Sequence, residues 1–208
     1  MKILALELST GRGTIACHPD GAVIAEVAFA NDRKHSGLFF ENLQQVLQRV
    51  VYPELIVVGL GPGSYAGTRI AIATALGLQG TTGARLIGIS SLRALETNAE
   101  EYCVIGDARR QSFFFARIVS RESAEGPLLC TRDELMARLA ANAHPVFASE
   151  KIDGVTDNVI PGYPSARVLA EIAASGNADE AAAPLEPIYL REPHITQPKS
   201  TPMPKLER

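Results

Sequence analysis

The feature that most constrains how this chain folds is an apolar run that passes through a glycine-rich turn into a segment of small side chains. Residues 55–60 are apolar without interruption, which predicts a strand buried on both faces. Residues 61–64 form the turn, and the segment from about Ala66 to Gln79 is expected to be a helix. A strand, a glycine turn and a helix in this order predict an α/β fold.

The glycine turn lacks the chemistry of a nucleotide-binding loop. A P-loop needs a lysine and then a serine or threonine after its glycines, and no lysine follows here. Residues 61–66 fit the looser dinucleotide pattern, but that fold also needs an acid about 20 positions further on, and residues 81–91 contain none. Ser64 lacks the full glycine pattern of a nucleophile elbow. The turn therefore predicts neither a nucleotide site nor a hydrolase.

The helix after the turn carries a row of small side chains. Gly67, Ala71 and Ala75 are four residues apart and share one face, with Thr74 and Leu78 beside them. Such a face lets a second backbone approach closely. That backbone belongs either to this chain's own sheet or neighbouring helix, or to a partner protein, and the spacing leaves both interpretations open.

Composition excludes several classes of protein. The 208 residues are 46% hydrophobic and 21% charged, which is ordinary for a soluble globular chain. A net charge of −3 argues against a protein that holds nucleic acid by its overall charge, so any such role is local or indirect. Three scattered cysteines predict neither a disulfide framework nor a zinc site. The first residues do not resemble a signal peptide and no stretch of 18 apolar residues exists, so we expect a cytoplasmic protein with no membrane contact.

The first half of the chain predicts a mixed lobe, residues 1–100. An Asp-Gly pair at residues 20–21 predicts a hairpin, and Ser90 or Ser91 is expected to cap a helix. The expected strands are residues 3–8, 14–17, 21–30, 55–60 and 86–89, and the expected helices are residues 36–50, 66–79 and one that begins near residue 91.

A smaller second lobe is expected at residues 101–183. The segment from Tyr102 to Val119 reads as a strand, an acidic turn and a returning strand, a weak repeat of the first 17 residues. Thr131 and Glu134 form a capping box for a helix to about residue 141, and a short strand at residues 145–148 and a helix at 164–174 follow. Residues 184–208 form a proline-rich tail, expected to dock at residues 185–191 and to be loose beyond 195.

Six motifs are spread over nearly the whole chain, at residues 3–10, 34–36, 61–70, 90–95, 107–110 and 187–191. Together, and in family order, they closely resemble the TsaB (YeaZ) family. The resemblance implies an actin-like, sugar-kinase-like pair of lobes with a reduced second lobe. It also implies a role in forming N6-threonylcarbamoyladenosine beside the anticodon of tRNA. In that family TsaB is the non-catalytic partner of its paralogue TsaD, which transfers the threonylcarbamoyl group, and the ATPase TsaE joins them.

The family pattern also assigns two helices of the first lobe to a dimer surface. In this chain that surface would comprise Phe39, Leu43, Val46, Gly67, Ile70, Ala71, Thr74, Ala75 and Leu78. Without the paralogue we expect the same face to pair with a second copy of the chain. The chain departs from the family at Glu7, where aspartate is usual, and at Gly37, where an acid is common.

Catalysis by this chain alone is not expected. Actin-like enzymes use glycines after an acidic strand end in each lobe, but Asp107 is followed here by Ala108, Arg109 and Arg110. A degenerate ATPase or kinase remains the alternative, with Ser9, Thr10, Asp107 and Arg109 as candidate phosphate ligands and ATP or ADP bound only within the complex. A peptidase is the least favoured reading, because the four histidines are isolated and predict no metal site.

Overall fold

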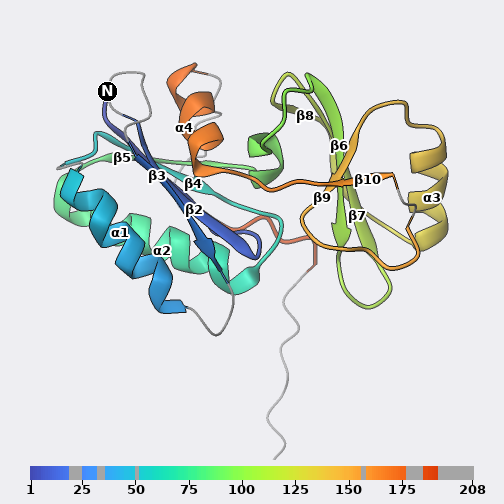
Figure 1. Cartoon of the computed structure of the whole chain (residues 1–208), viewed down its shortest axis with the longest axis horizontal. Coiled ribbons are helices and arrows are strands. Elements are labelled where there is room, and N and C mark those ends of the chain that lie inside the picture. The colour runs from blue at the N-terminus through green and yellow to red at the C-terminus, as the bar shows by residue number, and fades with distance from the viewer. Residues whose placement is uncertain (19–24, 32–35, 50–51, 156–157, 177–184, 192–208) are drawn as a thin grey trace, which may run out of the picture.

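Two five-stranded mixed sheets, each with helices, make up the two lobes of the chain (Figure 1). The computed structural model describes residues 1–18, 25–31, 36–49, 52–155, 158–176 and 185–191. The first sheet has the order β3-β2-β1-β4-β5. Its strands are β1 (Ile3–Glu7), β2 (Arg12–His18), β3 (Ala25–Ala30), β4 (Leu55–Gly59) and β5 (Arg85–Ile89). The first three strands form an antiparallel meander, while β4 and β5 run parallel to β1.

Both faces of the first sheet are apolar, because successive side chains of a strand point to opposite faces. Leu4 and Leu6 of β1 point to one face, and Ile3 and Ala5 point to the other. Residues of β4 alternate in the same way. The apolar run at residues 55–60 is uninterrupted because the strand is buried on both faces, as the sequence predicts.

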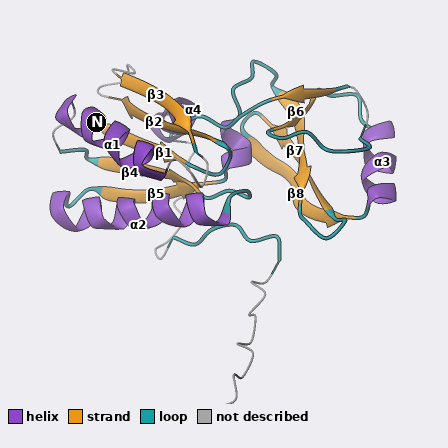
Figure 2. Ribbon diagram, turned by 60° about the horizontal axis from the view of Figure 1, so that its bottom comes forward, coloured by secondary structure: helices purple, strands orange, loops and turns teal. Residues whose placement is uncertain are grey.

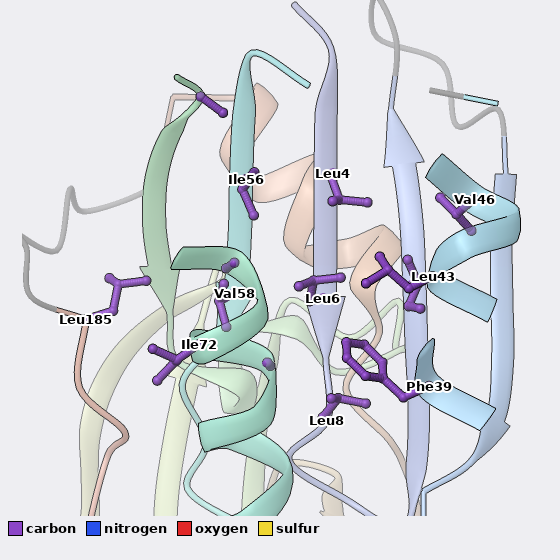
Figure 3. Close-up of a cluster of buried hydrophobic side chains, with 14 of the residues drawn as sticks. Leu4, Leu6, Leu8, Phe39, Leu43, Val46, Ile56, Val58, Ile72 and Leu185 are labelled. Carbon is purple, nitrogen blue, oxygen red and sulfur yellow. The ribbon is translucent and has the colours of Figure 1, made fainter. Parts of the chain in front are cut away.

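Helices α1 (Ser36–Arg49) and α2 (Tyr65–Thr82) cover one face of this sheet, and α4 (Ala166–Ala174) covers the other (Figures 1 and 2). Figure 3 shows the core under α1 and α2, where Phe39 of α1 points toward the leucines of β1 and Ile72 of α2 lies near Val58 of β4. Gly83 ends α2 in a left-handed conformation, φ 70°, and its N–H donates to the carbonyl oxygen of Gln79.

The second sheet repeats the strand order of the first. Its order is β10-β9-β6-β7-β8, so its first, second and third strands again form a meander, and its fourth strand again pairs in parallel with its first. The strands are β6 (Glu101–Asp107), β7 (Phe113–Val119), β8 (Glu122–Cys130), β9 (Val146–Ala148) and β10 (Val159–Pro161). The repeat expected from the two acidic strand ends therefore extends through both sheets.

Helix α3 (Arg132–Ala140) covers the outer face of the second sheet, and the 3-10 helix η1 (Ser91–Ala94) packs on its inner face. The capping box at Thr131 and Glu134 is confirmed, since each side chain bonds the other residue's backbone N–H. The α-helix expected near residue 91 is wrong, because the segment makes one 3-10 turn. The strands β8 and β10 were not predicted.

The tail and α4 cross the expected division between the lobes. We assigned residues 101–183 to the second lobe, but α4 packs on β1, β2 and β4 of the first. Leu185 is buried in the core beneath α2, and the N–H of Ile188 donates to the carbonyl oxygen of Leu60 at 2.8 Å. The docking of residues 185–191 is thus confirmed. The hairpin at residues 20–21, the motif residues Lys34 and His35, and the tail beyond 191 lie outside the described residues.

Candidate functional site

The glycine turn is held tightly against the end of β1. The N–H of Ser64 donates to the carbonyl oxygen of Ser9 at 2.6 Å. A Cβ at Gly63 would lie 2.1 Å from that oxygen, and one at Gly67 would lie 2.1 Å from the carbonyl oxygen of Leu8. The glycines are therefore required by the approach of the chain's own backbone.

Polar side chains around the turn are also occupied by the chain itself. The Oγ of Ser64 accepts the Gly67 N–H and caps α2. Ser91 holds Gly61 by two hydrogen bonds, because its Oγ accepts the Gly61 N–H and its own N–H donates to the Gly61 carbonyl oxygen, both at 2.9 Å. The hydroxyls of Ser64 and Ser91 are therefore used to hold the turn in place.

Glu7 ends β1 as a buried carboxyl. Its Oε1 accepts the N–H of Ser9 at 2.6 Å, while its Oε2 has no hydrogen-bond partner. Burial raises the pKa of the Glu7 carboxyl above its ordinary value of 4.5, although the nearby hydroxyls of Ser9 and Ser91 and the Ser9 N–H oppose the shift. Gly59 of β4 makes room for this side chain, since a Cβ there would lie 1.8 Å from Oε2.

Ser9 and Thr10 line a cavity of about 20 Å³ between the lobes. That volume has room for about one water molecule. The Ser9 Oγ is buried without a hydrogen-bond partner, whereas Thr10 Oγ1 donates to the carbonyl oxygen of Arg12. The rest of the lining is largely apolar and includes Leu92, Leu95, Val104, Ile105 and Phe114.

Asp107 and Arg109, the candidates from the second acidic turn, pair with each other. Asp107 accepts the backbone N–H of Arg109 at 2.7 Å and its guanidinium at 3.1 Å. Neither residue lines the cavity. Three consecutive residues, Arg109, Arg110 and Gln111, have φ between 52° and 66°, a left-handed conformation that costs energy for residues other than glycine. The structure therefore brings Ser9 and Thr10 together but keeps Asp107 and Arg109 apart from them.

Within the described part of the chain, the metal-ligating residues form no cluster and the cysteines are buried. No three His, Cys, Asp or Glu residues there lie close enough to hold a metal ion. Cys17, Cys103 and Cys130 are free and buried, and burial raises the pKa of Cys17 and of Cys103 to about 11. Among the same residues, no helix is both long and apolar enough to cross a bilayer.

Six of the nine residues predicted for the dimer surface have little exposure in the single chain. Phe39, Leu43, Val46, Gly67, Ala71 and Ala75 are buried within the chain. The row of small residues thus packs on the chain's own sheet, the alternative that the spacing had left open. Ile70 is 36% exposed, and Thr74 and Leu78 are half-buried, so a partner contact at these three stays a prediction.

A second row of small or apolar residues faces solvent on α2. It occupies the opposite side of the helix and is here named the outer face; its members are Ala66, Ile70, Ala73, Gly77 and Gly80. Leu76 beside it is 49% exposed, and Phe40 on α1 is 55% exposed. Apart from Ile70, sequence analysis did not identify this face. Helix α2 has one charged residue, Arg69, in 18 positions, so polarity does not mark the side toward solvent.

Comparisons with known proteins agree with this fold. YeaZ from Pseudomonas aeruginosa superposes with a TM-score of 0.70 at 20% identity, over 91% of this chain and all of that one. A structure titled as an uncharacterized protein similar to the peptidase YEAZ from Pseudomonas aeruginosa superposes with a TM-score of 0.72 at 23% identity, over 91% of this chain and 99% of that one. The expected fold of two lobes with mixed sheets and helices is confirmed, and it is the fold of YeaZ.

Sequence comparison extends the agreement. An uncharacterized protein of Mycobacterium tuberculosis is 27% identical over 204 residues, which cover 92% of each chain. The model of a family described as "TsaD: tRNA N6-adenosine threonylcarbamoyltransferase" matches residues 22–185. This match spans most of the chain. The chain also has the fold of YeaZ (TsaB), the family that its motifs resemble. Because the family model matches most of its length, the chain belongs to the TsaD family, which is described as tRNA N6-adenosine threonylcarbamoyltransferase.

Proposed function

We propose that this chain is a non-catalytic, TsaB-type subunit that docks on a TsaD-like paralogue and supports the formation of N6-threonylcarbamoyladenosine in tRNA. The observation that carries the proposal is the outer face of α2, which is apolar, built of small residues and exposed. Exposed apolar surface of this kind marks an interaction site. The family match supports the choice of this reaction.

The shape of the outer face suits helix-on-helix packing. Alanines and glycines at intervals of three or four residues allow a partner helix to approach closely. Helix α1 extends the surface with a shallow groove lined in part by Phe40, Gln44 and Leu47. A stable contact here would bury about 1,600 Å² in total, the usual size for specific complexes.

A supporting role is favoured over catalysis by the state of the acidic turns. Glu7 is enclosed in the core, and Asp107 is paired with Arg109. The cavity between the lobes has a volume of about 20 Å³, room for about one water molecule. On this proposal ATP or ADP binds only where the partner completes a site, and a TsaE-like ATPase joins the assembly in the cytoplasm, where the tRNA is.

Substitution of Ala73 tests the docking surface. Ala73→Arg adds a long charged side chain at the centre of the outer face, while arginine favours helix as well as most residues do. We expect the variant to fold but to lose both the complex with the paralogue and the tRNA modification. Light scattering coupled to gel filtration, followed by a tRNA modification assay on the fractions, measures both losses.

The matched control is Ala137→Arg, the same change at an exposed helical position in α3 on the second lobe. It should leave the complex and the modification at their original levels. Retention of a one-to-one complex and full activity by Ala73→Arg would refute the proposed surface. Without the paralogue, the wild-type chain should elute as a dimer and Ala73→Arg as a monomer.

A further inference from the structure

We propose that this chain contacts single-stranded RNA directly through an exposed patch of tyrosines and arginines where the two lobes meet. The patch, here named the tyrosine-arginine patch, comprises Tyr65, Arg69, Arg110, Tyr189 and Arg191. The inference rests on the proposed function for the identity of the RNA, which would be the tRNA being modified. It goes further by giving this subunit, whose net charge is −3, a local RNA contact of its own.

Three segments bring these side chains together. Tyr65 and Arg69 lie in the first turns of α2, and Tyr189 packs on Tyr65 with ring centroids 5.4 Å apart. Residues 185–191, red in Figure 1, run from the first lobe toward the second. At their end the guanidinium of Arg191 donates to the Oγ of Ser112, in the turn that also holds Arg110.

The two tyrosines form an exposed aromatic platform. Tyr65 is 49% exposed and Tyr189 is 41% exposed, and their rings are tilted by 32°. The guanidinium carbon of Arg69 lies 4.8 Å from the centroid of the Tyr65 ring. An exposed tyrosine beside an arginine offers a face on which an unpaired base can stack, and such stacking is tolerant of sequence.

The positive charges of the arginines in the patch are not neutralised by an acidic side chain of the described residues. Within the described residues, Arg69, Arg110 and Arg191 form no ion pair with an acid, whereas Arg109 is paired with Asp107. Glu186, the acid of the same docked segment, forms no ion pair with any of the three. A planar guanidinium can bind two oxygens of a phosphate at once. A positive, aromatic surface fits a phosphate-bearing strand with unpaired bases better than it fits an apolar protein helix.

Binding of RNA by the full chain alone tests this inference. The probe is a fluorescently labelled RNA hairpin with a seven-nucleotide single-stranded loop, titrated by anisotropy at several salt concentrations. Three phosphate contacts predict that the binding constant falls with salt with a log–log slope of about −2. Tyr189→Ala should weaken binding roughly 10-fold, as expected for one lost stacked base. Arg191→Ala should reduce the magnitude of the slope by about 0.7, the share of one phosphate contact.

Two controls remove the same chemistry elsewhere. Tyr52→Ala deletes a tyrosine that is 69% exposed near the opposite end of β4, and Lys151→Ala deletes an exposed charge of the second lobe. Both should leave RNA binding unchanged. Equal losses in the controls and the patch variants would overturn the inference, and so would binding of a polyglutamate peptide without binding of RNA.

The outcomes separate this inference from the proposed function. Absence of RNA binding by the wild-type chain, while Ala73→Arg still disrupts the complex, would overturn only the RNA contact. RNA binding that depends on Tyr189, while Ala73→Arg leaves the complex intact, would support the contact and refute the docking surface.

Discussion

At the scale of single residues, Glu7 gives the clearest prediction. Burial raises its pKa above 4.5, so the folded chain keeps this proton to a higher pH than the unfolded chain does. The free energy of unfolding therefore falls as the pH rises from about 4.5 through the raised pKa, and stays lower above it. Glu7→Gln lacks the titrating proton. Its stability advantage over the wild type should grow with pH across that window, as thermal unfolding from pH 4 to pH 8 would measure. A difference that stays constant with pH would contradict the assignment.

The surroundings of Glu7 also mark a limit of sequence reasoning at this scale. The carboxyl at the end of β1 and Gly59 at the end of β4 are both visible in the sequence. Their contact is not, because it depends on the parallel register that pairs Leu6 with Val58. The same holds for Gly63 and Gly67, whose tight approach to Ser9 and Leu8 comes from packing between distant segments.

At the scale of elements, the sequence predicted a helix correctly where all residues of a local capping motif are present. The capping box of α3 is such a case, with Thr131 and Glu134 each satisfying a backbone N–H of the other. Thr131→Ala should lower the free energy of unfolding by about 1 kcal/mol, measured by urea denaturation. Thr131→Ser keeps the hydroxyl and should cost much less. Equal losses for the two variants would show that the cap does not stabilise the helix.

Elements without such signals were missed or misplaced. The strand β8 shows no regular alternation of buried and exposed residues and contains Gly126 and Pro127, and β10 is three residues long. The sequence also did not show which side of α2 faces the core, because both sides of this helix carry small residues. Only the sheet beneath it decides that Ala71 faces inward and Ala73 outward.

At the scale of the whole molecule, the docked segment at residues 185–191 ties the two lobes together. Leu185 is 7% exposed and packs in the core of the first lobe, while Arg191 reaches Ser112 of the second. Leu185→Ala should lower the free energy of unfolding by about 2–5 kcal/mol, as other buried leucines do. Leu129→Ala, at a position 42% exposed, should change it by no more than about 0.5 kcal/mol. Urea unfolding of both variants measures the difference, and a similar small loss for Leu185→Ala would show that the segment adds no stability.

The return of α4 to the first sheet has a consequence for the chain during its synthesis. The face of β1, β2 and β4 that α4 covers is apolar, and it is complete once β5 has been made. Its cover ends at Ala174, so more than 80 further residues must leave the ribosome before that face is shielded. A nascent chain of this protein therefore exposes a surface that aggregates or recruits chaperones, and the speed at which the second lobe is translated sets how long it does so.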